Sequence, residues 1–286
     1  ASRTPLIADH EIVSIPSAST LAVIRRETKG RKPAPKMIAV LADPVFESSD
    51  ERLTSAREMK KPAGQFVSQS RRGESVSDLK RAASDVALSE REIKLQRLPF
   101  TRREAERIAS LFRREEVKKA LDFDASRTTA LSNEMKEYRY VHFATHGFLN
   151  TRHPELSGLA LSMFDKEGAE QDGFLRANEV YNLSLPAELV VLSGCRTGLG
   201  KEIRGEGLIS LTRAFMYAGA ARVMVSLWDV NDEATAEFMS RFYTAIVKQK
   251  MTPAAALRFA QAQMSKDPRW NHPYYWAGFI LQGEPY

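Results

Sequence analysis

The sequence predicts an α/β fold in which helices cover both faces of a mostly parallel sheet. One observation is a set of short apolar runs, for example 188–193 and 221–227, each long enough for one fully buried strand. Another is that stretches with helical apolar spacing separate these runs, as crossover helices separate parallel strands. A third is that two runs stop at a reactive side chain, His146 and Cys195, and parallel sheets place their sites beyond the carboxyl ends of strands.

The first half of the chain contains the less regular elements. Residues 11–15 and 20–25 have the composition of two short strands, and 36–41 is typical of a buried strand that Asp43 and Pro44 close. The other elements expected before residue 200 are a helix that Thr101 and Glu104 open as a capping box, a helix over 128–136, strands over 140–145, 156–162 and 188–193, and a helical turn over 175–182.

The second half alternates helix and strand more regularly. A helix over 207–218 with one apolar face stops at Gly219 and is followed by the strand over 221–227. The last elements expected are a helix capped by Asn231 or Asp232 with a core stripe of Phe238, Phe242 and Ile246, a helix that begins at Thr252 and Pro253, and a strand over 275–281.

The length of the chain allows a compact globular fold, and the distribution of its charge does not favour binding of nucleic acid. The 286 residues can form one large domain or two small ones, and a compact fold of this size buries about three quarters of the surface of the unfolded chain. The net charge is +6, from 42 Lys and Arg against 36 Asp and Glu, and much of the basic excess lies in segments that also contain acids. Nucleic-acid-binding proteins concentrate such an excess in a patch or stripe, so direct binding of nucleic acid is not expected.

Cysteine content and hydropathy bear on location. A single cysteine cannot form a disulfide within the chain, so the protein needs no oxidising compartment. No apolar run approaches the about 20 residues of a membrane helix, and residues 1–4 lack the apolar core of a signal peptide. We therefore expect a cytoplasmic protein with no membrane contact. The absence of an initiating methionine suggests either processing or a domain cut from a longer chain.

A polar stretch interrupts the predicted fold. Residues 47–97 are dominated by serine, lysine, arginine and acids, with Phe66 as the single aromatic residue. We expect a variable, partly disordered surface insertion, because so few apolar side chains cannot offset the entropy of ordering the chain. The insertion contains the basic pair Arg71 and Arg72, at which a protease with a preference for basic residues would cut its own chain.

His146 and Cys195 together have the chemistry of a cysteine hydrolase. A thiolate attacks an amide carbonyl, the leaving nitrogen must receive a proton, and the tetrahedral oxyanion needs hydrogen-bond donors. Cys195 would be the nucleophile and His146 the acid and base. Gly147 has no side chain, so its backbone N–H can approach a substrate oxygen, and the N–H of Cys195 is the second candidate for the oxyanion hole.

Neither a metal site nor a nucleotide site is expected. His142 and His146 lie four residues apart on a strand rather than a helix, and Phe143 stands where a zinc protease has its glutamate. His142 lies inside the strand, so we expect a packed, hydrogen-bonded core histidine. Residues 194–202 lack the first glycine and the hydroxyl residue of a phosphate-binding loop. No cofactor is therefore expected.

Several motifs give the chemistry a family context. Cys195 lies 49 residues after His146, close to the roughly 50 between the caspase histidine and cysteine. The motifs are His142-Phe143-Ala144-Thr145-His146-Gly147, Leu192-Ser193-Gly194-Cys195-Arg196-Thr197-Gly198, Gly205-Glu206-Gly207, Ala214-Phe215, Gly219-Ala220, Ser226-Leu227-Trp228-Asp229-Val230 and His272-Pro273-Tyr274-Tyr275-Trp276-Ala277-Gly278-Phe279. Together they make residues 98–286 similar to the CHAT domain, a caspase-related family often fused behind tetratricopeptide repeats.

The resemblance implies a caspase-like three-layer α/β/α sandwich with a mostly parallel central sheet. It also implies one CHAT protease domain over 1–286, with 47–97 inserted, and a catalytic dyad of His146 and Cys195. The regulatory partner it implies is a tetratricopeptide-repeat domain or protein.

Two acids are candidates for substrate binding. The stretch 227–230 resembles the part of separases in which an aspartate serves an arginine-selective pocket, which assigns Asp229 to a pocket for Arg or Lys. The alternative is that Asp229 only shapes the turn into the next helix. Glu206 lies between two glycines and is either a second polar contact to substrate or a first-turn acid at a helix N-terminus.

These features predict a regulated cysteine endopeptidase that cleaves a protein substrate after a basic residue. The first alternative is a catalytically silent caspase-like scaffold that binds partner proteins. The second is a nucleic-acid-associated effector, which only the net charge favours.

Overall fold

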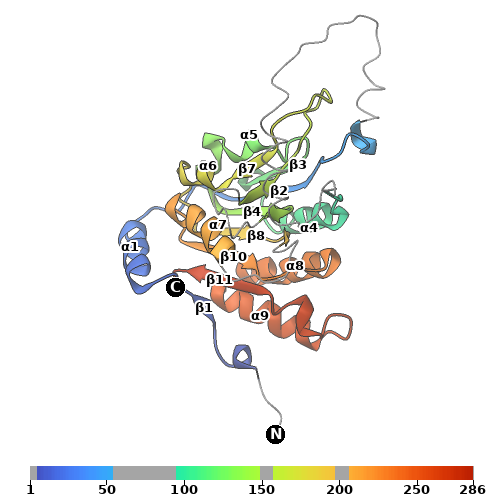
Figure 1. Ribbon diagram of the computed structural model, residues 1–286. Helices are drawn as coiled ribbons and strands as arrows, with labels where there is room; N and C mark the ends of the chain where they lie inside the picture. The colour runs from blue at the N-terminus through green and yellow to red at the C-terminus, as the bar shows by residue number, and fades with distance from the viewer. Residues whose placement is uncertain (1–4, 54–94, 149–156, 197–205, 286) are drawn as a thin grey trace, which may run out of the picture.

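The computed structural model describes residues 5–53, 95–148, 157–196 and 206–285 (Figure 1). Most of the predicted insertion, residues 54–94 with the Arg71–Arg72 pair, therefore lies outside the described residues. Among the residues that are described, no helix is long and apolar enough to cross a membrane.

A seven-stranded sheet forms the centre of the molecule (Figure 1). Its strand order is β1-β11-β10-β8-β4-β2-β3, in which β10, β8, β4, β2 and β3 run parallel and β11 runs antiparallel to β10. The expectation of a mostly parallel sheet is thus confirmed. The strands are β1 (Val13–Ser14), β2 (Lys36–Pro44), β3 (Val117–Asp122), β4 (Tyr138–Ala144), β8 (Leu189–Leu192), β10 (Arg222–Ser226) and β11 (Phe279–Gly283).

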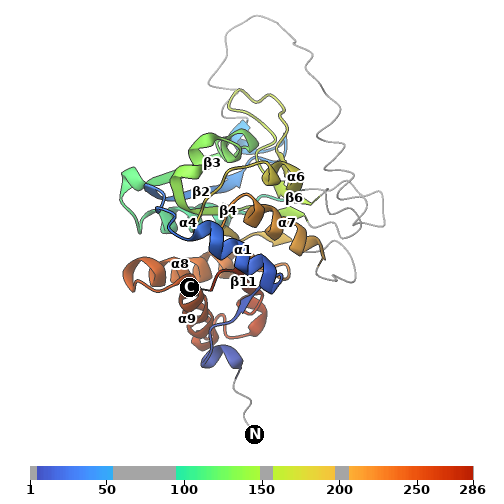
Figure 2. The ribbon, with the colours of Figure 1, turned by 90° about the vertical axis from the view of Figure 1, so that its left-hand side faces the viewer.

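Helices cover both faces of this sheet, which gives the predicted three layers. On one face lie α4 (Pro99–Ala109), α8 (Asp232–Lys248) and α9 (Pro253–Lys266). On the other lie α1 (Ala18–Thr28), α6 (Ala177–Tyr181) and α7 (Glu206–Tyr217), and Figure 2 faces the side where α1 and α7 lie. Shorter helical segments are α5 (Arg127–Ala130), η1 (Leu6–Ala8), η2 (Arg114–Glu116), η3 (Asn133–Glu137) and η5 (Pro273–Tyr275).

The central strands are mostly apolar because both of their faces are buried. On β2, Ile38 and Val40 belong to the core beneath α4, α8 and α9, whereas Ala39 and Leu41 belong to the core beneath α1, α6 and α7. This alternation follows from the two-residue period of a strand. It also explains why the sequences of β2 and β8 contain continuous apolar runs.

A second, smaller sheet lies where the chain leaves β4 and β8, and the sequence did not predict it. Its strand order is β7-β6-β5-β9. Because β5 follows β4 and β9 follows β8 in the chain, this sheet extends the pairing of β4 with β8 beyond the turns that lead to His146 and Cys195. Its strands are β5 (Gly147–Phe148), β6 (Gly158–Ala160), β7 (Phe174–Arg176) and β9 (Cys195–Arg196).

The structure corrects the expected strand over 20–25. These residues lie in α1, which begins after Ser17, whose side chain accepts a hydrogen bond from the backbone N–H of Thr20 at 3.0 Å. A serine N-cap of this kind satisfies one of the unpaired N–H groups of the first turn, so the local pattern favours a helix.

The predicted capping box at Thr101 and Glu104 is also wrong. Helix α4 begins at Pro99, three residues earlier than a cap at Thr101 requires, and the missing N–H of proline costs nothing at the first helical position. Thr101 instead donates to the carbonyl oxygen of Leu98 at 2.6 Å and accepts from the backbone N–H of Asp43 at 3.1 Å. Glu104 is fully buried and bonds to a histidine of the sheet.

Candidate active site

Neighbouring strands bring the histidine and cysteine segments together. Phe143 of β4 pairs with Leu192 of β8, and His146 and Cys195 each follow three residues later. Beyond the turns, β5 and β9 pair again, with Gly147 directly opposite Cys195. The backbone of Cys195 is therefore adjacent to the residue after His146, while its side chain lies outside the described part of the structure.

Gly194 explains how the two chain segments approach so closely. A Cβ atom at this position would lie 2.4 Å from the carbonyl oxygen and 2.9 Å from the carbonyl carbon of Thr145. Both are backbone atoms, so no side-chain movement could relieve the clash. Glycine at 194 is thus required by the contact between the residue before His146 and the residue before Cys195.

His146 is buried, and one of its ring nitrogens has a defined partner. Its Nε2 lies 2.7 Å from the backbone carbonyl oxygen of Gln96, and its ring centroid lies 5.2 Å from that of Phe46. A carbonyl oxygen can only accept a hydrogen bond, so Nε2 must carry a proton. In the neutral ring, Nδ1 then has the lone pair that can take a proton from a thiol.

Asp229 lies at the same edge of the sheet as the histidine and the cysteine. It follows β10, the neighbour of β8, and its side chain is exposed. Its backbone carbonyl oxygen accepts a hydrogen bond of 2.7 Å from the hydroxyl of Tyr274. The cap of α8 is supplied by Asn231, whose side chain accepts from the N–H of Ala234 at 2.9 Å. The Asp229 side chain is therefore not needed to begin that helix.

The segment around Asp229 is held by the aromatic residues before β11. The indole N–H of Trp228 donates to the carbonyl oxygen of Tyr274 at 2.9 Å. The Trp228 ring packs so closely on Gly278 that a Cβ atom there would lie 2.8 Å from the ring. This packing accounts for the glycine in the Trp-Ala-Gly-Phe motif and fixes the backbone on both sides of Asp229.

Glu206 is the first residue of α7. This is the position of a first-turn acid at a helix N-terminus, as one of the two interpretations of the sequence required. Its side chain lies outside the described part of the structure, as does that of Cys195.

His142 has no part in this site, and its predicted role as a core histidine is confirmed. Its ring is fully buried, with Nε2 2.7 Å from Oε1 of Glu104 and Nδ1 3.1 Å from the hydroxyl of Tyr243. Within the described ranges, no group of three or more His, Cys, Asp or Glu residues could hold a metal ion.

The family follows from a comparison with known domains. A CHAT domain family model matches residues 1–284, which is almost the whole chain. The chain belongs to the CHAT domain family. Two relatives are Tetratricopeptide repeat protein 28 of Homo sapiens, 39% identical over 113 residues, and that of Mus musculus, 37% identical over 109 residues. These alignments cover 40% and 38% of the CHAT domain but 4% of each relative.

Solved structures with the same fold include a separase–securin complex and a cysteine proteinase. The separase–securin complex of Saccharomyces cerevisiae aligns over 96% of the CHAT domain and 14% of that chain, with a TM-score of 0.52 and 12% identity. The Arg-specific cysteine proteinase gingipain R aligns over 94% of the CHAT domain and 52% of that chain, with a TM-score of 0.53 and 10% identity. At these identities the likeness establishes the caspase-like fold.

Sequence reasoning missed the residues that surround His146 in the CHAT domain. Phe46 follows β2, and Gln96 precedes α4, so neither is near His146 in the sequence. Gln96 also acts through its backbone carbonyl, which every residue type has. No pattern of side chains could therefore have pointed to it.

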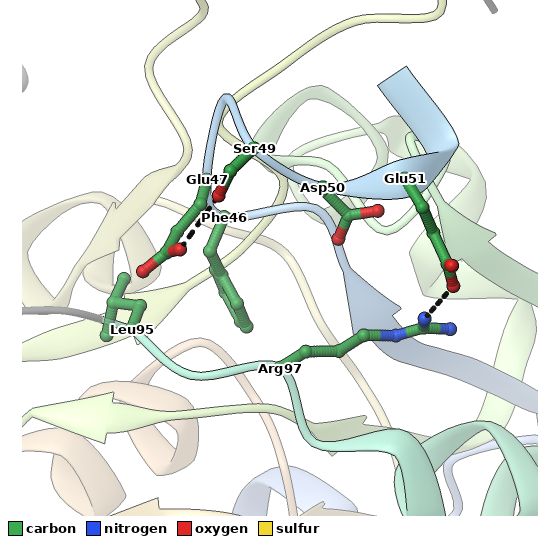
Figure 3. Close-up of a pocket in the computed structure, with 7 residues that line it drawn as sticks. All are labelled: Phe46, Glu47, Ser49, Asp50, Glu51, Leu95 and Arg97. Atoms are coloured by element: carbon green, nitrogen blue, oxygen red, sulfur yellow. Dashed lines mark hydrogen bonds and ion pairs between the residues drawn. The ribbon is translucent and has the colours of Figure 1, made fainter. Parts of the chain in front are cut away.

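Phe46, whose ring packs against His146, also lines a cavity of about 360 Å³ (Figure 3). Figure 3 shows Phe46 and Leu95 near one end of the cavity and Arg97 reaching along it toward Glu51. The guanidinium of Arg97 pairs with the buried carboxylate of Asp43, and this hydrogen bonding raises the pKa of Arg97 above its usual value. The full lining is Phe46, Glu47, Ser49, Asp50, Glu51, Leu95 and Arg97.

Proposed function

We propose that this CHAT domain is a cysteine endopeptidase that uses Cys195 as nucleophile and His146 as acid and base. The observation that carries the proposal is the paired geometry of the two segments. β4 with β8, and then β5 with β9, hold the residues around His146 and Cys195 side by side. The carbonyl of Gln96 supports it, because it leaves the other ring nitrogen of His146 as the proton acceptor.

In the proposed reaction, Nδ1 of His146 takes the thiol proton of Cys195, and the thiolate adds to the carbonyl carbon of the peptide bond. The backbone N–H groups of Gly147 and Cys195 stabilise the resulting oxyanion. The oxyanion collapses, the C–N bond breaks, and His146 gives its proton to the leaving amine. Water then loses a proton to His146 and attacks the thioester, and the released thiolate takes that proton back.

The proposed substrate is a protein with Arg or Lys before the cut bond. The carboxylate of Asp229, at the end of β10, would pair with this basic side chain, and Glu206 is a second candidate for contact with substrate. Gingipain R has the same fold and is an Arg-specific cysteine proteinase, which supports a basic residue before the cut bond. The fixed backbone around Trp228 supports it as well, because specificity requires a carboxylate held in one place.

The proposed domain organisation is one CHAT domain over 1–286 with 47–97 inserted, within a longer protein. Regulation by a tetratricopeptide-repeat domain or partner is part of this proposal. The similarity to Tetratricopeptide repeat protein 28 supports that association. The burial of His146 supports control of access, because a substrate must reach this side chain before it can react.

The same burial is the observation that favours the second candidate, a catalytically silent scaffold. The two functions make different predictions about the thiol. The chain has one cysteine, so alkylation of the whole protein reports on Cys195 alone. In a peptidase the nearby histidine should lower the pKa of the thiol below its usual value of about 8.5.

The test is the pH dependence of alkylation by iodoacetamide, combined with cleavage of a proteome extract. We expect wild type to react at a lower pH than His146→Asn, and His10→Asn, a change at an exposed histidine, to react like wild type. New termini in the extract should follow Arg or Lys and be absent with Cys195→Ala. An alkylation profile that His146→Asn leaves unchanged, together with no new termini, would identify the scaffold.

A further inference from the structure

We propose that Asp43 and Arg97 are positioning residues for His146, because their ion pair holds the Gln96 carbonyl that fixes the proton on Nε2 of the histidine. The inference deepens the proposed function and rests on it for its catalytic consequence. The arrangement itself depends only on contacts between described residues.

The Gln96 carbonyl needs an external support. It lies in the segment 95–98, which belongs to neither a helix nor a strand, and the side chain of Gln96 is exposed. No regular hydrogen-bond ladder therefore fixes the orientation of this peptide group. Yet the 2.7 Å bond to His146 requires its oxygen to stay in one place.

Arg97 supplies that support from the next residue along the chain. Its Nε donates to Oδ1 of Asp43 at 2.8 Å, and its Nη2 donates to Oδ2 of the same carboxylate at 2.8 Å. Two parallel bonds to one carboxylate fix both the distance and the plane of the guanidinium. The Asp43 side chain is 0% exposed, so solvent screens this pair less than it screens a surface pair.

Leu95 anchors the other side of Gln96. It is buried in a small apolar cluster with Phe46, the residue whose ring lies against His146. The peptide that carries the carbonyl is thus held between an apolar contact on one side and an ion pair on the other.

Asp43 is itself a rigid reference point. It lies near the end of β2, immediately after Ala42, which pairs with Ala144 of β4. His146 follows Ala144 by two residues. His146 and Asp43, the residue that binds Arg97 beside Gln96, therefore both follow directly on the same paired residues of the sheet.

The surroundings of Asp43 are as tightly defined. Its φ of 49° lies in the left-handed region that non-glycine residues rarely adopt, and its N–H donates to Oγ1 of Thr101. Arg102 also contacts the carboxylate, with its Nε 2.8 Å from Oδ2, and Arg52 places Nη1 3.3 Å from Oδ1. Of these three arginines, Arg97 alone neighbours Gln96 in the sequence.

Loss of the Arg97 pair should release the carbonyl and let the proton of the neutral ring move to Nδ1. That nitrogen could then no longer accept the thiol proton, so the thiolate of Cys195 would form less readily. A base displaced by about 1 Å can cost about 100-fold in rate.

The experiment measures the ring nitrogens of His146 by ¹⁵N NMR in the full chain, together with the alkylation rate of Cys195. The His146 signals are identified by their loss in His146→Asn. We expect wild type to have its proton on Nε2. In Arg97→Ala we expect a mixture of tautomers and alkylation at least 10-fold slower at neutral pH. Arg97→Lys keeps the charge but not the paired bonds, so an intermediate result is expected.

Arg102→Ala is the matched control. Arg102 binds the same carboxylate and has nearly the same side-chain exposure, 32% against 34% for Arg97. A purely structural role of the ion pairs predicts equal effects of the two substitutions on His146. Our inference predicts that both lower the melting temperature but that only the Arg97 change alters the tautomer.

Two outcomes would overturn the inference: a wild-type tautomer in Arg97→Lys and Arg97→Ala, or an equal shift in Arg102→Ala. Arg97→Lys provides the same test if Arg97→Ala fails to fold. The tautomer is read without any substrate, so its result is independent of peptidase activity. A shifted tautomer in a protein that cleaves nothing would keep the positioning role and remove the proposed function.

Discussion

At position 194 the chain has no room for a side chain, which leads to a prediction at the scale of one residue. In Gly194→Ala the new Cβ would clash with the backbone of Thr145, with 2.4 Å to its carbonyl oxygen. The strand ends must then separate, so we expect Cys195 alkylation and any peptide cleavage to fall about 100-fold or more. Both rates are measured on purified variant.

The control is Gly30→Ala. Gly30 has a φ of 74° but nothing within 4 Å of the position of a Cβ atom. This change should lower the melting temperature, because alanine is strained there, and leave the alkylation rate unchanged. Equal alkylation rates in Gly194→Ala and wild type would show that the close approach of the His146 and Cys195 segments does not affect the reactivity of the thiol.

Asp229 carries a second prediction at this scale. If its carboxylate binds the basic side chain of the substrate, Asp229→Ala should lose at least 10-fold in cleavage after Arg and Lys relative to cleavage after neutral residues. A peptide library measures this ratio. Asp229→Asn is the matched variant, because it keeps the size of the side chain and removes its charge. Unchanged preference in both variants would leave Asp229 as a residue of the turn before α8.

The sequence identified His146, Cys195 and Asp229 as candidates because side-chain identity carries their proposed chemistry. Gln96 and Phe46 could not be found in this way. One presents only a backbone carbonyl, and the other makes an apolar contact that depends on how distant segments pack.

At the scale of elements, the buried contact of Glu104 and His142 links α4 with β4, and Tyr243 adds α8. Removal of one partner leaves a buried polar group without its bond, so we expect His142→Leu to destabilise the fold by about 3–5 kcal/mol. The double change Glu104→Leu with His142→Leu should cost less than the sum of the single changes, because neither member of the Glu104–His142 pair is then left without the other. Chemical denaturation of the four proteins measures this coupling. Additive costs would contradict it.

The N-terminus of α8 carries a pH-dependent prediction. Burial raises the pKa of Asp232 from 3.8 to about 6, although its carboxylate accepts the N–H of Phe100 at 3.0 Å. Between about pH 4 and 6 the unfolded chain therefore loses this proton more readily than the folded one, so the contribution of Asp232 to stability falls as pH rises. Asp232→Asn can keep the hydrogen bond, so it should melt higher than wild type at pH 8 and like wild type below about pH 4.

The neighbouring exposed acid provides the control for that prediction. Glu233 lies in the same first turn, and Glu233→Gln should lower stability slightly at pH 8, because a negative charge is favourable at a helix N-terminus. For Asp232→Asn at pH 8 we expect a gain of about 1 kcal/mol in the free energy of unfolding, or a rise of about 2–4 °C in the melting temperature. The gain is modest because the carboxylate of Asp232 is partly exposed to solvent. A lower melting temperature of Asp232→Asn at pH 8 would contradict the assignment.

Elements were predictable where the apolar pattern was strong and missed where it was weak. β3 was not predicted, because it is an edge strand whose Lys118 and Lys119 interrupt the apolar run and only Ala120 is buried. Lysines are typical of such edges, where they discourage pairing with other chains. The helix over 232–248, in contrast, has a predicted core stripe that is buried, and its cap, Asn231, is one of the two residues that the sequence offered.

At the scale of the whole molecule, the layers could be predicted but the small second sheet could not. Each central strand is apolar on both faces, and this property alone requires helices on both sides of the sheet. Strand β6 of the small sheet lies within the predicted strand over 156–162, but β5, β7 and β9 have two or three residues each, too few for a periodic pattern to be visible. That sheet nevertheless carries the pairing of Gly147 with Cys195.

The position of the insertion relative to the site leads to the last prediction. Glu51 and Leu95 flank residues 54–94 and line the same cavity beside Phe46, whose ring contacts His146. The segment therefore re-enters the described structure at Leu95, next to the Gln96 carbonyl that His146 contacts. A tethered segment reaches a local concentration of about millimolar, so a peptidase that prefers basic residues should cut its own chain after Arg71 or Arg72.

Intact-mass analysis over time measures this self-cleavage. We expect fragments from wild type, none from Cys195→Ala, and none at this site from the double change Arg71→Ala with Arg72→Ala. Because the segment is tethered, the fraction cut per unit time should not change when the protein is diluted 100-fold. A rate that falls in proportion to dilution would show cleavage between molecules. An uncut chain under conditions where another protein is cleaved would contradict the prediction, since the tethered pair has the higher local concentration.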